Sequence, residues 1–488
     1  MISSSPSSSL PIRNIPGDYG LPFFGPIRDR YDYFYKQGKD DFFKSRMKKY
    51  SSTVFRTNMP PGPFISSNPH VIVLLDTISF PILFDTDKIE KKDILDGTYM
   101  TSTSFFGGYR VCTFLDPSEP KHSKLKQLCF SLVASRHNKF IPLFQNSLSQ
   151  LFDNLDSEIL EKSTVFFNTL SDSISFDYLF RLFFNKSPSE TKMGSDGESS
   201  MITWLALQLA PKAKIGSPWI PNVVEDLLLH TFKLPSFLAK SGYEKIYESI
   251  YVSSTEILDE AEKLGISREE ACHNLVFNFG FNAYAGTKRV FPALFKWIGL
   301  AGKTLHTQEL PTFNTQLADA IRAVVMLEGR ALTFTSLEKM PLTKSVVYET
   351  FRMEPPVPFQ YGKAKQDLVV QSHEAAFEIK KVELICGYQP IVTRDPKVFK
   401  NPEEFVGDRF VGMEGETLLK YVYWSNAWET ENPTVDNKQC AGRDLVVLMT
   451  RLMVVEFFLR YDTFTVETGT SGTGGSTVTI TSLTEKAT

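Results

Sequence analysis

The chain has 488 residues, of which 42% are hydrophobic and 22% are charged, and these fractions exclude a disordered or fibrous protein. The formal net charge of −3 gives no general attraction to nucleic acid or to an anionic membrane. The length suits one very large domain or a few ordinary ones.

The numbers of phenylalanines and cysteines further restrict the class of protein. The 40 phenylalanines suit a protein that encloses an apolar cofactor or substrate, although a core that is merely rich in phenylalanine is the alternative. The five cysteines are odd in number, scattered and without a CxxC pair. They predict neither a disulfide framework nor a zinc site, and they favour a reducing compartment.

The N-terminal segment, to about Gly62, is rich in proline, glycine and aromatic residues. We expect residues 1–10 to be disordered, and they contain no apolar run long enough for a signal peptide or a membrane anchor. The Ser-rich start leaves a fragment of a plastid transit peptide as an alternative. A short helix is predicted near Tyr31–Tyr50, and β-type runs are predicted at Phe64–Ile65 and Val71–Asp76.

Helical periodicity dominates the middle of the chain, and short strands are expected towards its end. The long helical stretches run from Lys121 to Leu182 and from Pro235 to Leu300. After Ser336 the sequence predicts a helix, a turn, short strands, a final helix and a Gly/Ser/Thr-rich tail with one more strand. The short strands are expected at Leu368–Val370 and Phe377–Ile379, and the final helix from about Gly442 to Tyr461. The fold class is mainly α with minor β.

Cys440, in the stretch NKQCAGRDLVVLMTRL, directly precedes the final amphipathic helix. A thiolate that faces the N-terminal end of a helix is stabilised by the amide dipoles there. Such a thiolate is able to ligate haem iron, and its electron donation favours cleavage of an O–O bond. A lone cysteine is more often structural, so this hypothesis depends on the other motifs.

Two of these motifs carry the charges of a buried network. In KSVVYETFRMEPP, Glu349 and Arg352 lie at i and i+3 on one helix face, and Arg409, in the DRF of NPEEFVGDRFVG, is a second basic partner. The order E-x-x-R, PP, short strands, DRF and then Cys before a terminal helix resembles the cytochrome P-450 superfamily. The resemblance implies a single cytochrome P-450 domain over residues 1–488. It also implies haem b as cofactor, with the Cys440 thiolate as the axial ligand of the iron.

Basic residues elsewhere resemble those that hold the haem propionates in this superfamily. Lys126, which follows HSKL after DPSEP, is one candidate, and Lys91, in KIEKKDIL, is a second. His122, which opens the HSKLK stretch that contains Lys126, and Lys438, two residues before Cys440, are also predicted to bind the haem. Solvated surface lysines are the alternative for each lysine.

The helix that crosses the haem departs from the pattern of oxygen-activating members. Those members carry A/G-G-x-D/E-T, whose acid and hydroxyl relay protons to oxygen on the iron. When Ala285 and Gly286 are aligned with the small pair, Lys288 and Arg289 occupy the acid and threonine positions, so this relay is missing. Asn282 lies just upstream and is predicted to orient an oxygen near the metal.

Over almost its full length the chain resembles the plant branch of the superfamily that metabolises fatty-acid hydroperoxides. This branch contains allene oxide synthases, hydroperoxide lyases and divinyl ether synthases. Matching stretches include LPIRNIPGDYG, DRYDYFYKQG, FRTNMPPGPFIS, LDPSEPKH, REEACHNLVF, PPVPFQYGKAK and NKQCAG. The chain looks most similar to the subgroup that acts on 9-hydroperoxides, or on 9- and 13-hydroperoxides alike.

The resemblance implies a hydroperoxide dehydratase, a lyase of oxylipin biosynthesis, that turns polyunsaturated fatty-acid hydroperoxides into allene oxides. It implies no need for O2, NADPH or a reductase partner. The catalytic residues would be Asn282 and Cys440, and Leu95, Thr113, Phe281, Asn282 and Ala285 would line the substrate pocket and control the product. A hydroperoxide lyase giving aldehydes and oxo-acids is the first alternative. Divinyl ether or epoxyalcohol products are the second, and Ala285 is a residue that divinyl ether synthases often carry at this position.

Several positions differ from the family pattern. Arg289 and Asn278 each replace an aliphatic residue in the haem-crossing helix, and Val382 replaces the glycine of a KKG turn. Residues Gln308–Gln316 look inserted and bring Pro311 into a helical stretch, which must break there. A buried arginine without a partner is costly, so Arg289 either reaches a propionate or another carboxylate, or impairs activity. A catalytically impaired haem-binding relative is therefore the alternative of another class.

The sequence contains no membrane-spanning segment and predicts no nucleic-acid partner. Peripheral association with membranes through an apolar surface patch remains an alternative. We expect the protein in the cytoplasm, in plastids or on lipid bodies.

Overall fold

Helices carry most of the chain, and short strands form small sheets, as the sequence predicted. The structure is a computed structural model that describes residues 10–66, 68–95, 98–302, 312–329, 332–423 and 426–486. Two compact units divide the chain. The first unit comprises residues 1–100, 219–233 and 357–400, and the second comprises residues 101–218, 234–356 and 401–488.

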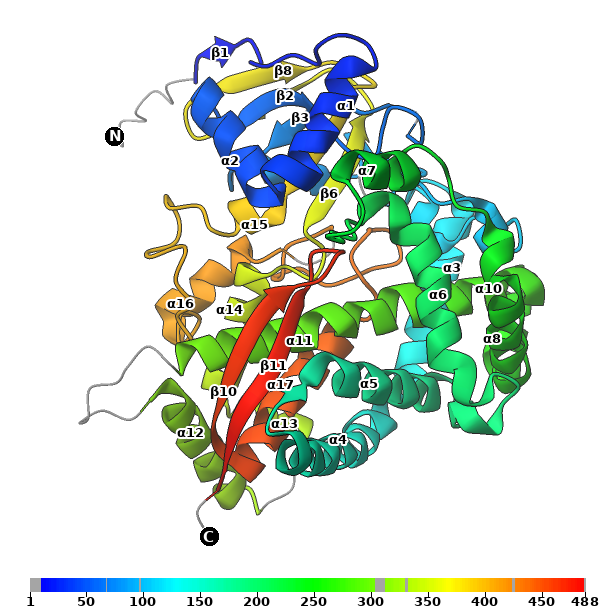
Figure 1. Ribbon diagram of the computed structural model, residues 1–488, viewed down its shortest axis with the longest axis vertical. Coiled ribbons are helices and arrows are strands. Elements are labelled where there is room, and N and C mark those ends of the chain that lie inside the picture. The colour runs from blue at the N-terminus through cyan, green and yellow to red at the C-terminus, as the bar shows by residue number, and fades with distance from the viewer. Residues whose placement is uncertain are drawn as a thin grey trace, which may run out of the picture. The chain divides into compact units, whose positions relative to one another are not determined.

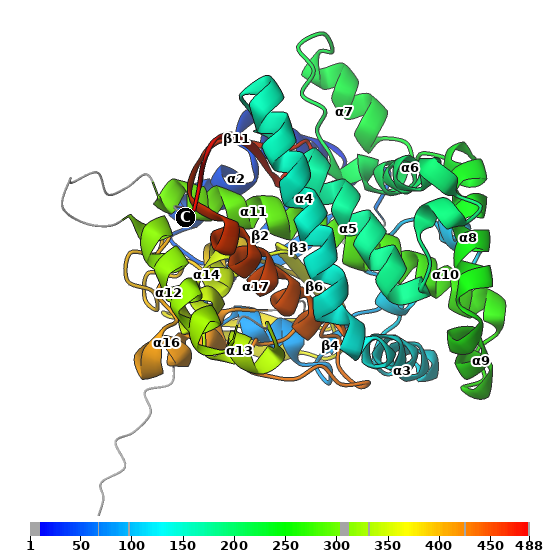
Figure 2. The same cartoon turned by 90° about the horizontal axis from the view of Figure 1, so that it is seen from below.

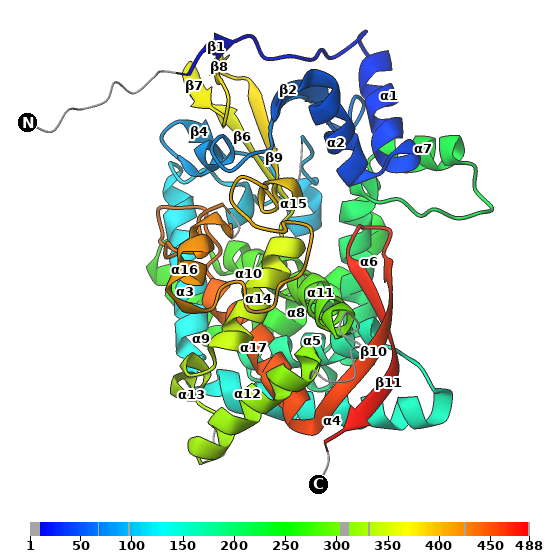
Figure 3. The same ribbon diagram turned by 90° about the vertical axis from the view of Figure 1, so that its left-hand side faces the viewer.

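The first unit is built on a five-stranded sheet with the strand order β2-β3-β9-β6-β4. All pairs in this sheet are antiparallel except β3 with β9. A smaller sheet places β8 between β1 and β7, as Figure 3 shows. The strands are β1 (Ile12–Arg13), β2 (Val54–Asn58), β3 (His70–Leu74), β4 (Ile89–Glu90), β6 (Phe359–Ala364), β7 (Leu368–Gln371), β8 (Ala376–Ile379) and β9 (Leu384–Tyr388).

Aromatic packing fills the interior of this unit. Phe42 and Phe43 are fully buried and lie edge-on to Tyr33, while Phe43 stacks on Tyr388 at 4.8 Å between ring centroids. The helices of the unit are α1 (Phe24–Tyr31), the π-helical turn η1 (Asp32–Lys36), α2 (Lys39–Tyr50), the 3-10 turn η2 (Phe80–Phe84), α7 (Asn222–His230) and α15 (Gln389–Val392). Part of the high phenylalanine content therefore forms the hydrophobic core of this unit.

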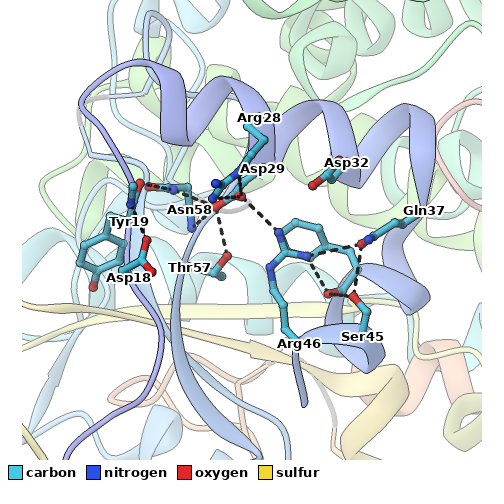
Figure 4. Close-up of polar contacts among 12 residues, drawn as sticks. Asp18, Tyr19, Arg28, Asp29, Asp32, Gln37, Ser45, Arg46, Thr57 and Asn58 are labelled. Carbon is cyan, nitrogen blue, oxygen red and sulfur yellow. Dashed lines mark hydrogen bonds and ion pairs between the residues drawn. The ribbon is translucent and has the colours of Figure 1, made fainter. Parts of the chain in front are cut away.

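A buried carboxylate ties α1 to the strand β2. Asp29 accepts hydrogen bonds from Nδ2 of Asn58 at 2.8 Å and from the guanidinium of Arg46 at 3.2 Å (Figure 4). Arg28 adds a further bond at 3.1 Å. Because Asp29 is only 2% exposed, these partners offset the cost of burying its charge.

The second unit is largely helical, and its strands are β5 (Val165–Phe166), β10 (Tyr461–Thr470) and β11 (Ser476–Glu485). In Figure 2 the helices α4, α5 and α17 lie side by side, and α11 crosses behind them. The longer helices are α3 (Pro120–Ser135), α4 (Phe140–Lys162), α5 (Phe167–Phe184), α6 (Gly197–Leu209), α8 (Lys240–Ser253), α9 (Thr255–Lys263), α10 (Arg268–Phe277), α11 (Ala285–Ala301), α12 (Phe313–Leu327), α14 (Pro341–Met353) and α17 (Arg443–Arg460), and the shorter are α13 (Phe334–Glu338) and α16 (Gly412–Leu418).

Helix α11 occupies a central place in this unit. It packs against α5, α14, α17 and the hairpin β10–β11, which crosses in front of it obliquely in Figure 1. Its core-facing residues include Phe291, Leu294 and Phe295, all at most 2% exposed. A π-helical segment, Asn278–Tyr284, joins α10 to α11 without a break. Wide π-helical turns of this kind occur frequently at functional sites.

Most predicted elements are present, and one prediction is wrong. The expected strand at Phe64–Ile65 does not form, because the preceding segment contains Pro60, Pro61 and Pro63, which lack the backbone N–H that a strand ladder needs. The strand β2 forms instead just before these prolines. Residues 1–9 and 308–311, which include most of the expected disorder and part of the expected insertion, lie outside the described residues. Thr312 caps α12 by accepting a hydrogen bond from the backbone of Thr315.

Among the described residues, no helix is both long enough and apolar enough to cross a membrane. The single domain predicted for residues 1–488 stays a prediction, since the chain groups into two units.

Candidate active site

Cys440 lies in the turn that leads into α17, and its side chain faces the first amides of that turn. The backbone N–H of Gly442 donates a hydrogen bond to Sγ of Cys440 at 3.4 Å. Burial raises the pKa of the Cys440 thiol, while this N–H and the charge of Lys126 lower it. The predicted placement of the cysteine before the final helix is therefore observed.

Basic side chains gather beside Cys440 in the same unit. Lys126, on α3, donates hydrogen bonds to Asn437, at 2.8 Å to Oδ1 and also to the backbone carbonyl. Lys438 donates to the backbone carbonyls of Thr113 at 2.8 Å and Leu115 at 2.7 Å. Burial lowers the pKa of Lys126 and of Lys438 to about 8, against the raising effect of neighbouring thiols and, for Lys438, of Asp116 and Glu119.

His122 completes this group, four residues before Lys126 on α3. It is 1% exposed, and its Nδ1 has no hydrogen-bonding partner among the described residues. Burial and the charges of Lys438 and Lys126 lower the pKa of His122 to about 4. An unsatisfied buried nitrogen beside two buried ammonium groups fits an anionic group such as a haem propionate. The residues present therefore fit haem, with Cys440 at the iron.

Asn282 projects from the π-helical segment and is exposed. Its Nδ2 donates a hydrogen bond to Oδ1 of Asn278 at 2.8 Å, and Nδ2 of Asn278 in turn donates to Sγ of Cys129 at 2.9 Å. The charge of Cys440 contributes to raising the pKa of the buried Cys129 thiol, after burial and the charge of Cys112. The hydrogen-bonded series Asn282, Asn278 and Cys129 therefore lies within electrostatic reach of the proposed iron ligand.

The side chains at the acid and threonine positions of the haem-crossing helix have other surroundings. Lys288 forms an ion pair with Asp172 of α5. Desolvation by burial raises the pKa of Asp172 to about 6, against the lowering effect of Lys288. Arg289 forms no hydrogen bond or ion pair with any described residue, and its Nε is buried. Neither side chain is an acid or a hydroxyl that relays protons.

The remaining predicted pocket residues divide between the two units. Phe281 stacks on Phe277 at 4.9 Å between ring centroids, and Ala285, one turn after it, is half-buried. Thr113 lies in the 3-10 turn η4 (Cys112–Phe114), where its carbonyl holds Lys438. Lys91, which is buried, and Leu95 belong to the other unit. The roles of all these pocket residues stay predictions.

The predicted network of one glutamate and two arginines is present. Glu349 accepts hydrogen bonds from Arg352 at 2.7 and 2.8 Å and from Nε of Arg409 at 3.0 Å. The side chains of Glu349 and Arg352 are fully buried, and that of Arg409 is 6% exposed. The arginines also donate to backbone carbonyls of residues 401–404. This network fixes residues 401–409 against α14 within the second unit.

Comparison with known proteins agrees with these features. The family model for Cytochrome P450 matches residues 308–425. Allene oxide synthase 1, chloroplastic, of Solanum lycopersicum is 54% identical over 99% of this chain and 90% of its own length. Allene oxide synthase 3 of the same organism is 55% identical over 98% of this chain and 95% of its length, and Divinyl ether synthase CYP74D1 is 49% identical over 96% of each. The chain belongs to the cytochrome P450 family. Within it, the chain falls in the branch that holds these synthases, and the cofactor of this family is haem with a cysteine thiolate on the iron.

Sequence reasoning missed some partners in this cytochrome P450. Cys129 is 149 residues from Asn278, and Asp172 is 116 residues from Lys288, so no local spacing indicates either pair. The replacement at Asn278 was the one available signal, because an amide in an aliphatic helix face requires a polar neighbour.

Proposed function

We propose that this chain is an allene oxide synthase, which dehydrates polyunsaturated fatty-acid hydroperoxides to allene oxides without O2, NADPH or a reductase. The observation that carries the proposal is the sequence identity of 54% and 55% to two allene oxide synthases over nearly the whole chain. The arrangement of Asn282 and Lys288 supports it, because it lacks the acid and hydroxyl of an oxygen-activating member.

The chain's own groups would divide the work as follows. Haem held by the Cys440 thiolate supplies electron density for cleavage of an O–O bond. The buried group of His122, Lys126 and Lys438 would bind the propionates through charge-assisted hydrogen bonds. The amide of Asn282 would orient the hydroperoxide, since one of its N–H groups is held by Asn278 and the remaining N–H and Oδ1 are available.

The proposal is tested by incubating purified haem-loaded protein with 9- and 13-hydroperoxides of linoleic acid without NADPH. Formation of ketols, the hydrolysis products of allene oxides, is the expected result. Aldehydes would identify a hydroperoxide lyase, and consumption only with NADPH and O2 would identify a monooxygenase. Unchanged substrate with an intact Soret band would identify an impaired relative. Cys440→Ser is expected to abolish the thiolate Soret signature while Cys112→Ser retains it.

A divinyl ether synthase is the second candidate, since Ala285 is the residue that favours this product and Divinyl ether synthase CYP74D1 is a relative. The same incubation separates the two products. Ala285→Gly is then expected to leave the ketol yield unchanged if the chain is an allene oxide synthase.

Peripheral membrane association is supported by the orientation of α7 within its unit. The charged residues and the histidine of this helix point inward: Glu225, Asp226 and His230 are 1%, 7% and 0% exposed. Arg30 binds Asp226 at 2.9 Å and the backbone carbonyl of His230 at 3.0 Å. The polar face of the helix is therefore used inside the unit.

The outward face of α7 is apolar instead. Its exposed apolar residues are Val223, Val224, Leu227 and Leu228, at 67%, 45%, 54% and 56%, with Trp219 at 89% just before the helix and Phe232 at 62% just after it. An outward apolar face suits the boundary between lipid headgroups and acyl chains, where a fatty-acid hydroperoxide also partitions. Replacing Leu227 and Leu228 by Gln is expected to reduce sedimentation with phosphatidylcholine vesicles. Met413→Gln, at an exposed position of the other unit, is the matched control.

A plastid location is supported by four relatives whose names include the word chloroplastic. A C-terminal fluorescent fusion in leaf cells tests it, and fluorescence confined to the cytoplasm would contradict it.

A further inference from the structure

Arg289 is an arginine without a counter-charge in the middle of the second unit. It lies on α11, four residues after Ala285, and is half-buried with a fully buried Nε. No hydrogen bond or ion pair joins it to any residue that the structure describes. Because a guanidinium stays charged at every physiological pH, its burial without a partner is costly.

The neighbouring lysines of the same helix, unlike Arg289, have acidic partners. Lys288 has Asp172 as its partner, and Lys296 contacts Glu354 and Ser476 at 3.2 and 3.1 Å. The nearby Glu198 accepts a hydrogen bond from Tyr284 at 2.8 Å. These three carboxylates are therefore already engaged, and none of them binds Arg289.

The position of Arg289 relates it to the proposed catalytic residue. It follows Asn282 by seven residues, and the π-helical segment that carries Asn282 continues without a break into the α-helix that carries Arg289. The tip of the hairpin β10–β11 approaches its stem, since a Cβ added at Gly475 would lie 3.9 Å from Cγ of Arg289. A ligand that extends from Asn282 along α11 towards this hairpin would meet the guanidinium.

We propose that Arg289 binds the carboxylate of the fatty-acid hydroperoxide while Asn282 orients its peroxide group. This inference rests on the proposed function for the identity of the ligand. A planar guanidinium accommodates a carboxylate through two parallel hydrogen bonds, and a compact ammonium does not. The carboxylate of the substrate thus supplies the negative charge that no described residue offers to Arg289.

The test compares a free fatty acid with its methyl ester, which lacks the negative charge. The probe is the 9-hydroxy analogue of the hydroperoxide, which has no O–O bond to react, and its binding is measured by Soret difference titration of the haem-loaded protein. Arg289→Leu is expected to weaken binding of the acid by about 10- to 100-fold, as expected for a lost charge-assisted bond, and to leave the ester unchanged. Arg289→Lys is expected to retain part of the preference for the acid.

Lys296→Gln is the matched control, because it removes a cation of the same helix that already has partners. It is expected to leave the ratio of acid to ester affinity unchanged. Equal weakening of acid and ester by Arg289→Leu would overturn the inference. So would loss of haem from that variant, which would assign Arg289 to a propionate. The proposed function fails separately, since it depends on the products formed from hydroperoxides and not on binding of the hydroxy analogue.

Discussion

Asn282 donates a hydrogen bond from Nδ2 to Oδ1 of Asn278, at 2.8 Å and four residues earlier on the same π-helical segment. Asn278 is itself held by its bond to Sγ of Cys129. Two successive bonds therefore fix the rotation of the amide that would face the substrate. Precise orientation of such a group is worth much of its catalytic effect.

Replacing Asn278 by Leu is expected to lower kcat by up to about 10-fold, the effect of one neutral hydrogen bond, while KM changes less than twofold. Asn278→Asp keeps the acceptor for Asn282 and is expected to retain most of the activity. Cys129→Ala removes the outer bond alone and is the control for packing. A loss in Cys129→Ala as large as that in Asn278→Leu would contradict the positioning role of Asn278.

The buried network around Glu349 predicts a large loss of stability on neutralisation. Glu349→Gln leaves Arg352 and Arg409 without their shared counter-charge, and breaking a buried pair in this way costs about 3–5 kcal/mol. Urea unfolding followed by fluorescence measures the loss. Glu416→Gln, whose side chain is 63% exposed and 3.9 Å from Lys344, is expected to change stability by less than about 1 kcal/mol. Similar effects of both changes would contradict the prediction.

The network around Glu349 was predictable from the sequence, because one pair follows from helix spacing and the third residue from a motif of the family. Glu349 and Arg352 share a helix face by their spacing alone, and the DRF motif brought Arg409 to them by resemblance. The pairing of Asn278 with Cys129 was beyond reach, since two elements far apart in sequence meet there only through tertiary packing. Propensity likewise misplaced a strand at Phe64–Ile65, where the neighbouring prolines decide.

His273 predicts a dependence of stability on pH. It is 6% exposed, its Nδ1 shares a hydrogen bond of 2.6 Å with the hydroxyl of Tyr243, and burial lowers its pKa to about 4. The unfolded chain binds a proton near pH 6.5, whereas the folded chain binds it only near pH 4. Above about pH 6.5 the histidine is neutral in both states and does not lower the free energy of unfolding. As the pH falls from 6.5 towards 4, only the unfolded chain binds the proton, and the free energy of unfolding falls by about 2 kcal/mol after solvent screening.

Urea unfolding of the protein and of His273→Gln, at several values between pH 4 and 7, measures this contribution. The variant is expected to lose less stability than the parent as the pH falls. Parallel curves for the two proteins would contradict the assignment to His273.

Val382 predicts a gain in stability on mutation. It stands at the glycine position of the KKG turn with φ of +68°, and it is 65% exposed. A β-branched residue in the left-handed region costs about 1–2 kcal/mol, which the greater flexibility of glycine in the unfolded chain partly offsets. Val382→Gly is therefore expected to stabilise the protein by about 1 kcal/mol in urea unfolding. Val369→Gly, at an exposed strand position of the same unit, is expected to destabilise instead.

The separation of Asn282 and Arg289 along the helix predicts which hydroperoxide is preferred. Seven α-helical residues at 1.5 Å each span about 10 Å, and the π-helical residues at the start of this stretch shorten the span slightly. An extended chain advances about 1.2 Å per bond, so a carboxylate lies about 10 Å from a substituent at C9 and about 14 Å from one at C13. With the carboxylate at Arg289, the 9-hydroperoxide therefore brings its peroxide to Asn282, whereas the 13-hydroperoxide overshoots it. The ratio of kcat/KM for the 9- over the 13-isomer is expected to exceed 10, and to fall towards one in Arg289→Leu or with methyl esters. A preference for the 13-isomer, or a ratio that Arg289→Leu leaves unchanged, would show that Arg289 does not set the register of the substrate.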